Sequence, residues 1–274
     1  SYTVSENCNT ASITWTRTGG TADGGAPHVQ ALSAAEKLAG AHNNITLGSN
    51  PVLVSGTIYT LDFTCTDAAG NAATTVSSTS VTYDNTPPSI SGTAPANNAF
   101  VNITQVSYTL SENCASASIT WTRTSGTADG SSPHTKTLTA GELTSGAHNN
   151  ITITNNPTLV SGAVYTITFN CTDAAGNMAG VITQTNVTYD NVNIVISAVA
   201  PASSVSVNNK QVSYTLSEAC SAGSVTWTRT GGTADAGSPR IQALTGTELN
   251  AGAHNAIILT NNPALRSEER RVGK

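Results

Sequence analysis

Cysteines are the first residues of this chain whose type and spacing could do chemistry. Cys8 and Cys65 stand 57 residues apart, and the same interval separates Cys114 from Cys171. No C-x-x-C pair occurs, so the spacing does not support a zinc site or a dithiol redox site. The fifth cysteine, Cys220, would have its counterpart at position 277, beyond the last residue, Lys274.

Catalytic motifs are missing from the sequence. It contains no G-x-S-x-G, no H-E-x-x-H, no phosphate-binding loop and no EF-hand loop, so no enzyme is predicted. We interpret the five histidines as exposed loop residues and the aspartates of the three T-A-D segments as turn formers. The T-W-T tryptophans are interpreted as core residues rather than exposed platforms for sugars. These residues are His28, His42, His134, His148, His254, Asp23, Asp129, Asp235, Trp15, Trp121 and Trp227.

An internal repeat organises the chain. SYTVSENC at Ser1 recurs as SYTLSENC at Ser107 and as SYTLSEAC at Ser213, so the period is 106 residues. That period is too long for a solenoid unit and has the size of an autonomous domain. We predict three domains and call them repeat 1 (1–85, without its first strand), repeat 2 (86–191, complete) and repeat 3 (192–265, without its last strands). Residues 266–274 read RSEERRVGK, resemble a translated sequencing adapter, and are interpreted as a non-native tail.

The composition excludes several classes of protein. Charged residues make up 10% of the chain and the net charge is -5, whereas an ordinary globular domain is ~25% charged. No basic patch is available, so nucleic acid is not a predicted partner. No run of about 18 apolar residues occurs, so no membrane span is predicted. The surface must be built from Thr, Ser, Asn and Gly, which is typical of exposed all-β proteins.

Repeat 2 alternates apolar and polar residues in short segments, as half-buried strands do. The expected strands cover 89–93, 106–110, the region of Ile119 and Trp121, 136–138, 151–153, 165–171 and 181–189. Residues 125–132 are expected to form a turn, and 140–145 one helical turn. Seven or so strands in ~100 residues predict an immunoglobulin-like β-sandwich.

Three motifs of repeat 2 resemble bacterial immunoglobulin-like domains, which occur in tandem in large surface proteins and adhesins. Leu159 and Tyr165 resemble the pair at the E–F corner of fibronectin type III and related domains. The run 172–177 resembles the T-D-x-A-G-N segment that follows strand F, and Tyr189-Asp190 resembles the linker at the domain end. The resemblance covers residues 1–265 and implies tandem immunoglobulin-like β-sandwiches. A fold alone says little about function.

The implied sandwich gives the cysteines a role. Its B–C and F–G loops share one pole, and Cys114 and Cys171 end the expected strands B and F. A disulfide between them is therefore expected, as is one between Cys8 and Cys65, and each would stabilise its domain by about 4 kcal/mol. Such bonds imply an oxidising, extracytoplasmic setting. Free buried thiols are the alternative.

Carboxylates are expected at the same pole. A tandem array places the end of one domain beside this pole of the next, which brings Asp84 toward Glu112 and Asp173. Carboxylate oxygens are ligands for Ca²⁺, so this group is a candidate calcium site. The alternative interpretation is that Asp173 caps its own turn and Asp84 is a solvated linker residue. The corresponding positions of the other copies hold Asp190, Glu218, Glu6 and Asp67.

These observations predict a structural protein. The chain is expected to be a stalk region of an extracellular or cell-surface protein that supports adhesion, with calcium as the one candidate cofactor. Its protein or glycan ligand would be bound by regions outside this fragment. Two alternatives stay open: a module that binds glycan or protein through the loops of one pole, and a non-catalytic spacer of a secreted enzyme.

Overall fold

The computed structural model describes residues 1–262 and residue 265, so the predicted tail at 266–274 lies outside the described residues. The chain divides into two compact units, Ser1–Asp190 and a second that begins at Asn191. Strands and short 3-10 turns are the regular elements of the described part, which confirms the predicted all-β class. In that part no helix is long and apolar enough to cross a membrane.

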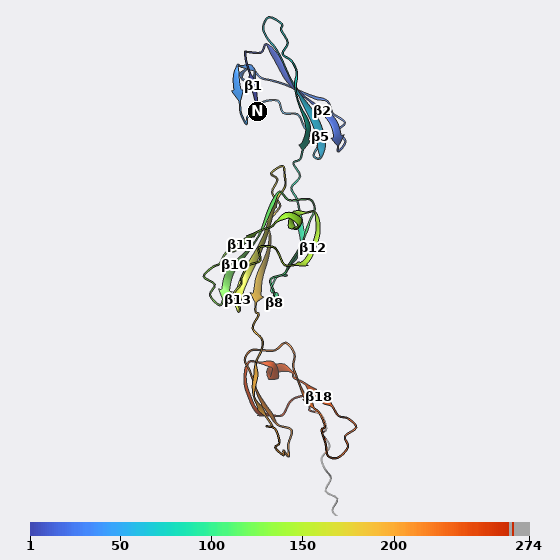
Figure 1. Ribbon diagram of the computed structural model, residues 1–274, viewed down its shortest axis with the longest axis vertical. Coiled ribbons are helices and arrows are strands. Elements are labelled where there is room, and N and C mark those ends of the chain that lie inside the picture. Colours follow the sequence, from blue (N-terminus) through green and yellow to red (C-terminus); the bar gives the residue numbers. More distant parts are fainter. Residues whose placement is uncertain (263–264, 266–274) are drawn as a thin grey trace, which may run out of the picture. The chain divides into compact units, whose positions relative to one another are not determined.

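Repeat 2 is built from two sheets with a common core (Figure 1). The three-stranded sheet has the order β12–β9–β7, and the five-stranded sheet has the order β11–β10–β13–β14–β8. This arrangement confirms the predicted immunoglobulin-like sandwich. The elements are β7 (Ile90–Ala94), β8 (Phe100–Val101), β9 (Val106–Leu110), β10 (Ser116–Gly126), β11 (His134–Thr137), η2 (Ala140–Leu143), β12 (Gly146–Ile151), β13 (Ala163–Thr172) and β14 (Ile182–Tyr189).

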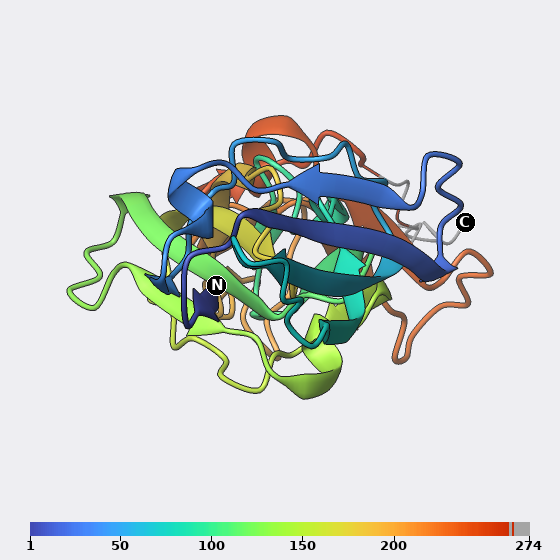
Figure 2. The same ribbon diagram turned by 90° about the horizontal axis from the view of Figure 1, so that it is seen from above.

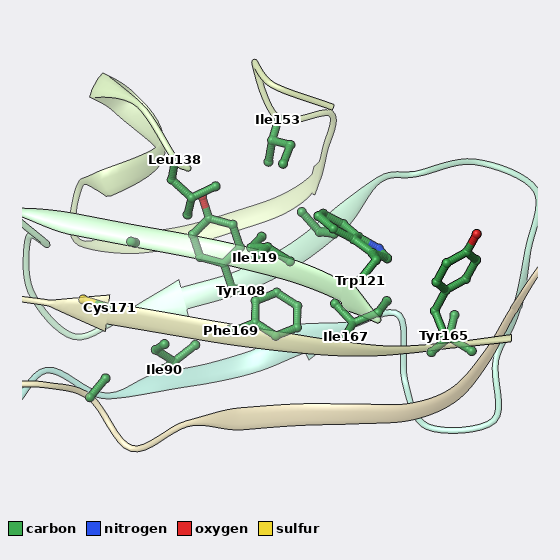
Figure 3. Close-up of a cluster of buried hydrophobic side chains, with 14 of the residues drawn as sticks. Ile90, Tyr108, Ile119, Trp121, Leu138, Ile153, Tyr165, Ile167, Phe169 and Cys171 are labelled. Atoms are coloured by element: carbon green, nitrogen blue, oxygen red, sulfur yellow. The ribbon is translucent and has the colours of Figure 1, made fainter. Parts of the chain in front are cut away.

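Strict alternation along β13 explains how the core forms. Successive side chains of a strand point to opposite faces of the sheet, and Tyr165, Ile167 and Phe169 are each at most 2% exposed. The threonines between them lie on the outer face and are half-buried. In Figure 3 the three apolar side chains gather with Tyr108 and Trp121 in the space between the sheets. Burial of this one face of β13 holds the two sheets together.

Three details of repeat 2 differ from the predicted strands. The short strand β8 pairs in parallel with β14 and has no counterpart in the prediction, because two residues give no periodic pattern. Strand β10 continues to Gly126 through a register shift between Arg123 and Ser125, so the turn begins later than predicted. Ile153 lies outside β12, although its side chain is only 1% exposed.

Repeat 1 has the same strand register but fewer strands. The order β3–β2–β5 can be followed in Figure 2 from mid-blue through dark blue to teal. Strand β6 completes this sheet, and β1 pairs with β4 in a second one. The elements are β1 (Tyr2–Val4), β2 (Thr10–Gly20), β3 (His28–Ala31), η1 (Ala35–Lys37), β4 (Gly40–His42), β5 (Thr57–Thr66) and β6 (Val76–Tyr83).

Repeat 3 lies in the second unit. Its described strands form the sheets β15–β16–β19 and β17–β18. The inner residues of β16, Tyr214 and Leu216, are buried, whereas β15 is exposed along its whole length. The elements are β15 (Ile196–Ala200), β16 (Val212–Leu216), β17 (Ser224–Trp227), β18 (Arg240–Ala243), η3 (Gly246–Leu249) and β19 (Gly252–Ile257).

Candidate functional site

Two disulfide bonds link the sheets of repeats 1 and 2, one bond in each repeat. Cys114 is bonded to Cys171 with 5.8 Å between their Cα atoms, and Cys8 is bonded to Cys65 with 5.6 Å. Cys114 follows β9 and Cys171 lies near the end of β13, so the bond links strands that belong to different sheets. Both side chains of this pair are buried. Cys220 is half-buried and makes no disulfide within the described part of the chain.

Three carboxylates converge beside the disulfide of repeat 2. One oxygen each from Asp84, Glu112 and Asp173 lies within 4.8 Å of the other two. Asp84 follows β6, Glu112 follows β9, and Asp173 follows β13, so three separate chain segments build the group. Asp173 is 4% exposed, and the other two residues are half-buried. In the described residues this is the one group of at least three His, Cys, Asp or Glu residues placed to hold a metal ion.

Asp173 also holds its own turn. Its Oδ1 accepts hydrogen bonds from the backbone nitrogens of Ala175 and Asn177, at 2.9 and 2.8 Å. Its Oδ2 accepts one from the amide nitrogen of Asn177 at 2.8 Å. These donors hold the pKa of Asp173 below its ordinary value although burial acts to raise it. Asp173 is therefore a turn cap, as one of the two interpretations of the sequence had it, and it still faces the other carboxylates.

Asp84 lies at the junction of repeats 1 and 2 and is hydrogen-bonded to residues of both repeats. Its Oδ1 accepts hydrogen bonds from Ser55 Oγ at 2.9 Å and from the backbone nitrogen of Thr86 at 3.0 Å. Its backbone carbonyl accepts one from Asn177 Nδ2 at 3.1 Å. Ser55 belongs to repeat 1 and Asn177 to repeat 2. The alternative interpretation of Asp84 as a solvated linker residue therefore does not hold, because residues on both sides of the junction bind it.

The surroundings of Glu112 disfavour the charged form of its carboxyl group. Its pKa is raised above the ordinary value, first by burial and then by the negative charges of Asp84 and Asp173. A group whose charged form is disfavoured in this way gains from a proton or from a cation. The three side chains together offer hard, anionic oxygen ligands of the kind that Ca²⁺ takes.

The other carboxylates predicted as calcium ligands have different surroundings. Glu6 is exposed and Asp67 is half-buried, and both lie at the corresponding pole of repeat 1. Asp67 caps its turn as Asp173 does, with Oδ1 accepting from Ala69 and Asn71 at 2.8 Å each. No third carboxylate accompanies them in the described residues. A site at Asp190 and Glu218 stays a prediction.

A buried network that the sequence did not predict joins the turn after β10 to the E–F corner. Asp129 Oδ2 accepts hydrogen bonds from His134 Nε2 and from the Tyr165 hydroxyl, each at 2.7 Å. The Tyr165 oxygen accepts one from the backbone nitrogen of Val160 at 3.0 Å. The side chains of His134 and Asp129 are 9% and 3% exposed. Predicting His134 as an exposed loop residue was wrong, because its ring is buried against this carboxylate.

The network recurs in repeat 1, and the described part of repeat 3 keeps its aspartate pair with one exchange. In repeat 1, Asp23 accepts from His28 and Tyr59, at 2.7 and 2.5 Å. In repeat 3, Arg240 replaces the histidine and pairs with Asp235 at 2.8 Å. The residue five positions after the aspartate is thus a hydrogen-bond donor in all three copies. That constant spacing was the signal available in the sequence.

The remaining histidines are stacked rather than exposed. His42, His148 and His254 lie on the rings of Tyr2, Tyr108 and Tyr214, with ring centroids 4.6–4.7 Å apart. Each imidazole also bonds a backbone carbonyl four residues earlier, at 2.9–3.0 Å. The A-H-N segments are therefore packing elements, and reading them as exposed loops was wrong.

Acid is expected to weaken repeat 2 through Asp129. Hydrogen bonds from His134 and then Tyr165 lower the pKa of Asp129 to about 2 from an ordinary 3.8. A carboxyl with a depressed folded-state pKa stabilises the fold above its unfolded pKa, and this stability is lost as the pH falls from about 4 to about 2. Urea unfolding of the whole chain between pH 5 and pH 2 measures the loss. Asp129→Asn should be less stable at pH 5 and should show a flatter acid response, and an unchanged acid slope would contradict this assignment.

Comparisons with known proteins bear on this fold. Residues 84–189 match the family model described as a bacterial Ig-like domain. None of the curated proteins matches the chain. A solved structure described as a tetra-tandem repeat in the extending region of a large adhesion protein is 18% identical, with a TM-score of 0.30. The alignment covers 94% of this chain but 61% of that one, so this chain spans less than two thirds of its length. The sandwich of β7–β14 and the match to the bacterial Ig-like domain model fall on the same residues.

Proposed function

We propose that this chain is a non-catalytic stalk region of a secreted or cell-surface protein that supports adhesion. One observation carries the proposal: Asp84, at the join of repeats 1 and 2, is hydrogen-bonded to Ser55 of repeat 1 and Asn177 of repeat 2. A spacer needs such a fixed join, whereas an unattached linker would behave as a flexible coil. The disulfides support an extracytoplasmic location, because such bonds persist in oxidising compartments.

The glycan-binding alternative receives less support from the site. Sugar-stacking platforms need exposed aromatic rings, and Trp121 is 2% exposed. The loops at the pole of repeat 2 offer carboxylates and backbone groups in place of aromatic rings. We therefore propose that any glycan ligand binds outside these loops.

We further propose that Ca²⁺ binds Asp84, Glu112 and Asp173 and stiffens the join. Three anionic oxygens from three chain segments would be drawn together by the ion, which would offset the repulsion that raises the pKa of Glu112. Binding to the folded state alone stabilises it by RT ln(1 + [L]/Kd), about 2.7 kcal/mol at a hundredfold excess over Kd.

Glu112→Gln provides the sharpest test, because Glu112 is not the cap of the turn at Asp173. Without calcium, the substitution should leave the melting temperature of repeat 2 unchanged or raise it, since it removes one of three repelling charges. With millimolar Ca²⁺, the wild-type chain should melt several degrees higher and the variant should not respond. Differential scanning calorimetry with calcium or with chelator measures both effects.

Glu6→Gln is the matched control, since Glu6 holds the same position in repeat 1 without a third carboxylate. It should leave the calcium response intact. If Glu112→Gln keeps the full response, the ion does not use this group. If the wild-type chain shows no response at all, the calcium proposal fails and the hydrogen-bonded spacer remains.

Stiffness itself is tested with Asn177→Ala. This substitution removes the bond to the Asp84 carbonyl, so it should broaden the distribution of distances across the join. Small-angle X-ray scattering of the whole chain should show a smaller radius of gyration for the variant. Asn71→Ala is the control, because its turn is the counterpart in repeat 1. Equal radii for the wild type and Asn177→Ala would count against a stalk held by this bond.

A further inference from the structure

The disulfide bond of repeat 2 divides the chain of that repeat into two parts. Cys114 and Cys171 are 57 positions apart in the sequence, but their Cα atoms are only 5.8 Å apart. We call residues 115–170 the enclosed segment, and residues 86–113 and 172–191 the outer segments. Strands β7, β8 and β9 lie in the first outer segment, and β14 lies in the second. The enclosed segment contains β10, β11, β12 and most of β13.

The enclosed segment has hydrogen bonds of its own. Strand β10 pairs with β11 and with β13. Asp129 accepts hydrogen bonds from His134 and Tyr165, and all three residues lie between the two cysteines in the sequence. A force that does not pass along the backbone of this segment leaves these bonds unloaded.

Non-covalent contacts hold the outer segments on the enclosed segment. Strand β9 pairs with β7 and with β12, and β14 pairs with β8 and with β13. Tyr108 of β9 and Val187 of β14 are each 2% exposed and pack in the same core as Trp121. A force that pulls on both ends of repeat 2 removes these contacts. The bond between Cys114 and Cys171 is covalent, so the removal stops there.

We propose that repeat 2 is an extensible link of limited length. A force on its two ends draws out the outer segments, and the disulfide bond transmits that force past the enclosed segment. This inference rests on the proposed stalk role, because a stalk that supports adhesion is pulled at both ends. An extended chain spans ~3.5 Å per residue, so the outer segments provide about 17 nm of chain and the enclosed segment withholds about 20 nm. The repeat therefore lengthens by a fixed amount instead of unravelling completely.

Burial of the disulfide bond sets the order of release. Disulfide exchange requires a thiolate to attack one of the two sulfurs. Cys114 is 6% exposed and Cys171 is 2% exposed, so the folded repeat shields both sulfurs from a thiol in solution. Once β9 and β14 are drawn out, the bond is open to such an attack. Dithiothreitol then reduces it: both cysteines leave as free thiols, and dithiothreitol becomes its own cyclic disulfide.

Single-molecule force spectroscopy of the whole chain, attached through peptide tags at its two ends, tests the proposal. Repeat 1 lies in the same path, and its bond between Cys8 and Cys65 also spans 57 positions. At constant force with dithiothreitol, the wild-type chain should extend first and then lengthen in two further steps, each of about 20 nm of chain. Without dithiothreitol, these two steps should not occur.

Cys114→Ala with Cys171→Ala should remove one of the two steps, and the matched control, Cys8→Ala with Cys65→Ala, should remove the other. This count does not require the variant to fold, because a repeat without its bond extends completely in the first phase. A wild-type chain without dithiothreitol-dependent steps, or a Cys114 and Cys171 variant that keeps both, overturns the proposal. Failure of the stalk role would instead show as equal radii in the scattering experiment on Asn177→Ala and would leave the steps unchanged.

Discussion

Replacing Cys114 and Cys171 together by alanine is expected to lower the free energy of unfolding of repeat 2 by about 4 kcal/mol. The bond closes a loop whose ends are separated by 57 residues, and breaking it returns that conformational freedom to the unfolded chain. Both cysteines are buried, so the alanines also lose a small amount of packing. For a domain of this size, such a loss is a large share of the total stability.

Hydrogen exchange read by mass spectrometry during a urea titration separates the repeats and measures the change. The matched variant, Cys8→Ala with Cys65→Ala, should move the transition of repeat 1 and leave that of repeat 2 in place. A reductant should reproduce both losses in the wild-type chain. A midpoint for repeat 2 that hardly moves would show that the sandwich does not depend on its bridge.

The second large effect is expected at Trp121. Its replacement by alanine should cost about 3–5 kcal/mol, the usual range for removal of a fully buried aromatic side chain. Trp121 is 2% exposed, and Pro95, Val101 and Ile103 line the small void beside it. These covering residues belong to the segment between β7 and β9, which also carries β8.

Trp15→Ala is the matched comparison, because the same T-W-T-R-T segment surrounds both tryptophans. Trp15 is half-buried, whereas Trp121 is 2% exposed. Trp15→Ala should therefore lower the free energy of unfolding less than Trp121→Ala does. Urea unfolding of the two variants measures the difference. Equal losses would mean that the covering segment adds nothing to the burial of Trp121.

The strands of repeat 2 were predictable where side chains alternate. Val106–Leu110 is found with the predicted bounds, and 165–171 lies within β13, because one face of each strand is buried. The strand at Phe100–Val101 was not predictable, because its pairing with β14 depends on tertiary contacts and leaves no local pattern.

The candidate site was predictable in part. Strand direction alone placed Glu112 and Asp173 at one pole, and the structure brings them together with Asp84. The bonds of Asp84 were not predictable, since Ser55 and Asn177 are remote in sequence. The network of Asp129 was missed because burial of a turn cannot be read from a polar segment.

The parallel pairing of β8 with β14 has a mechanical consequence. The backbone nitrogens of Asn98, Thr188 and Asp190 donate to carbonyls of Thr185, Ala99 and Val101, at 2.8–2.9 Å. Tension on repeat 2 enters at its first residues, passes β7, which pairs with β9, before it reaches β8, and leaves through β14. Once β7 has separated from β9, the load falls on β8 and β14. Because they run in the same direction, tension slides them past each other along their length. All three bonds are then loaded in shear at the same moment, so repeat 2 resists extension better than strands that separate one bond at a time.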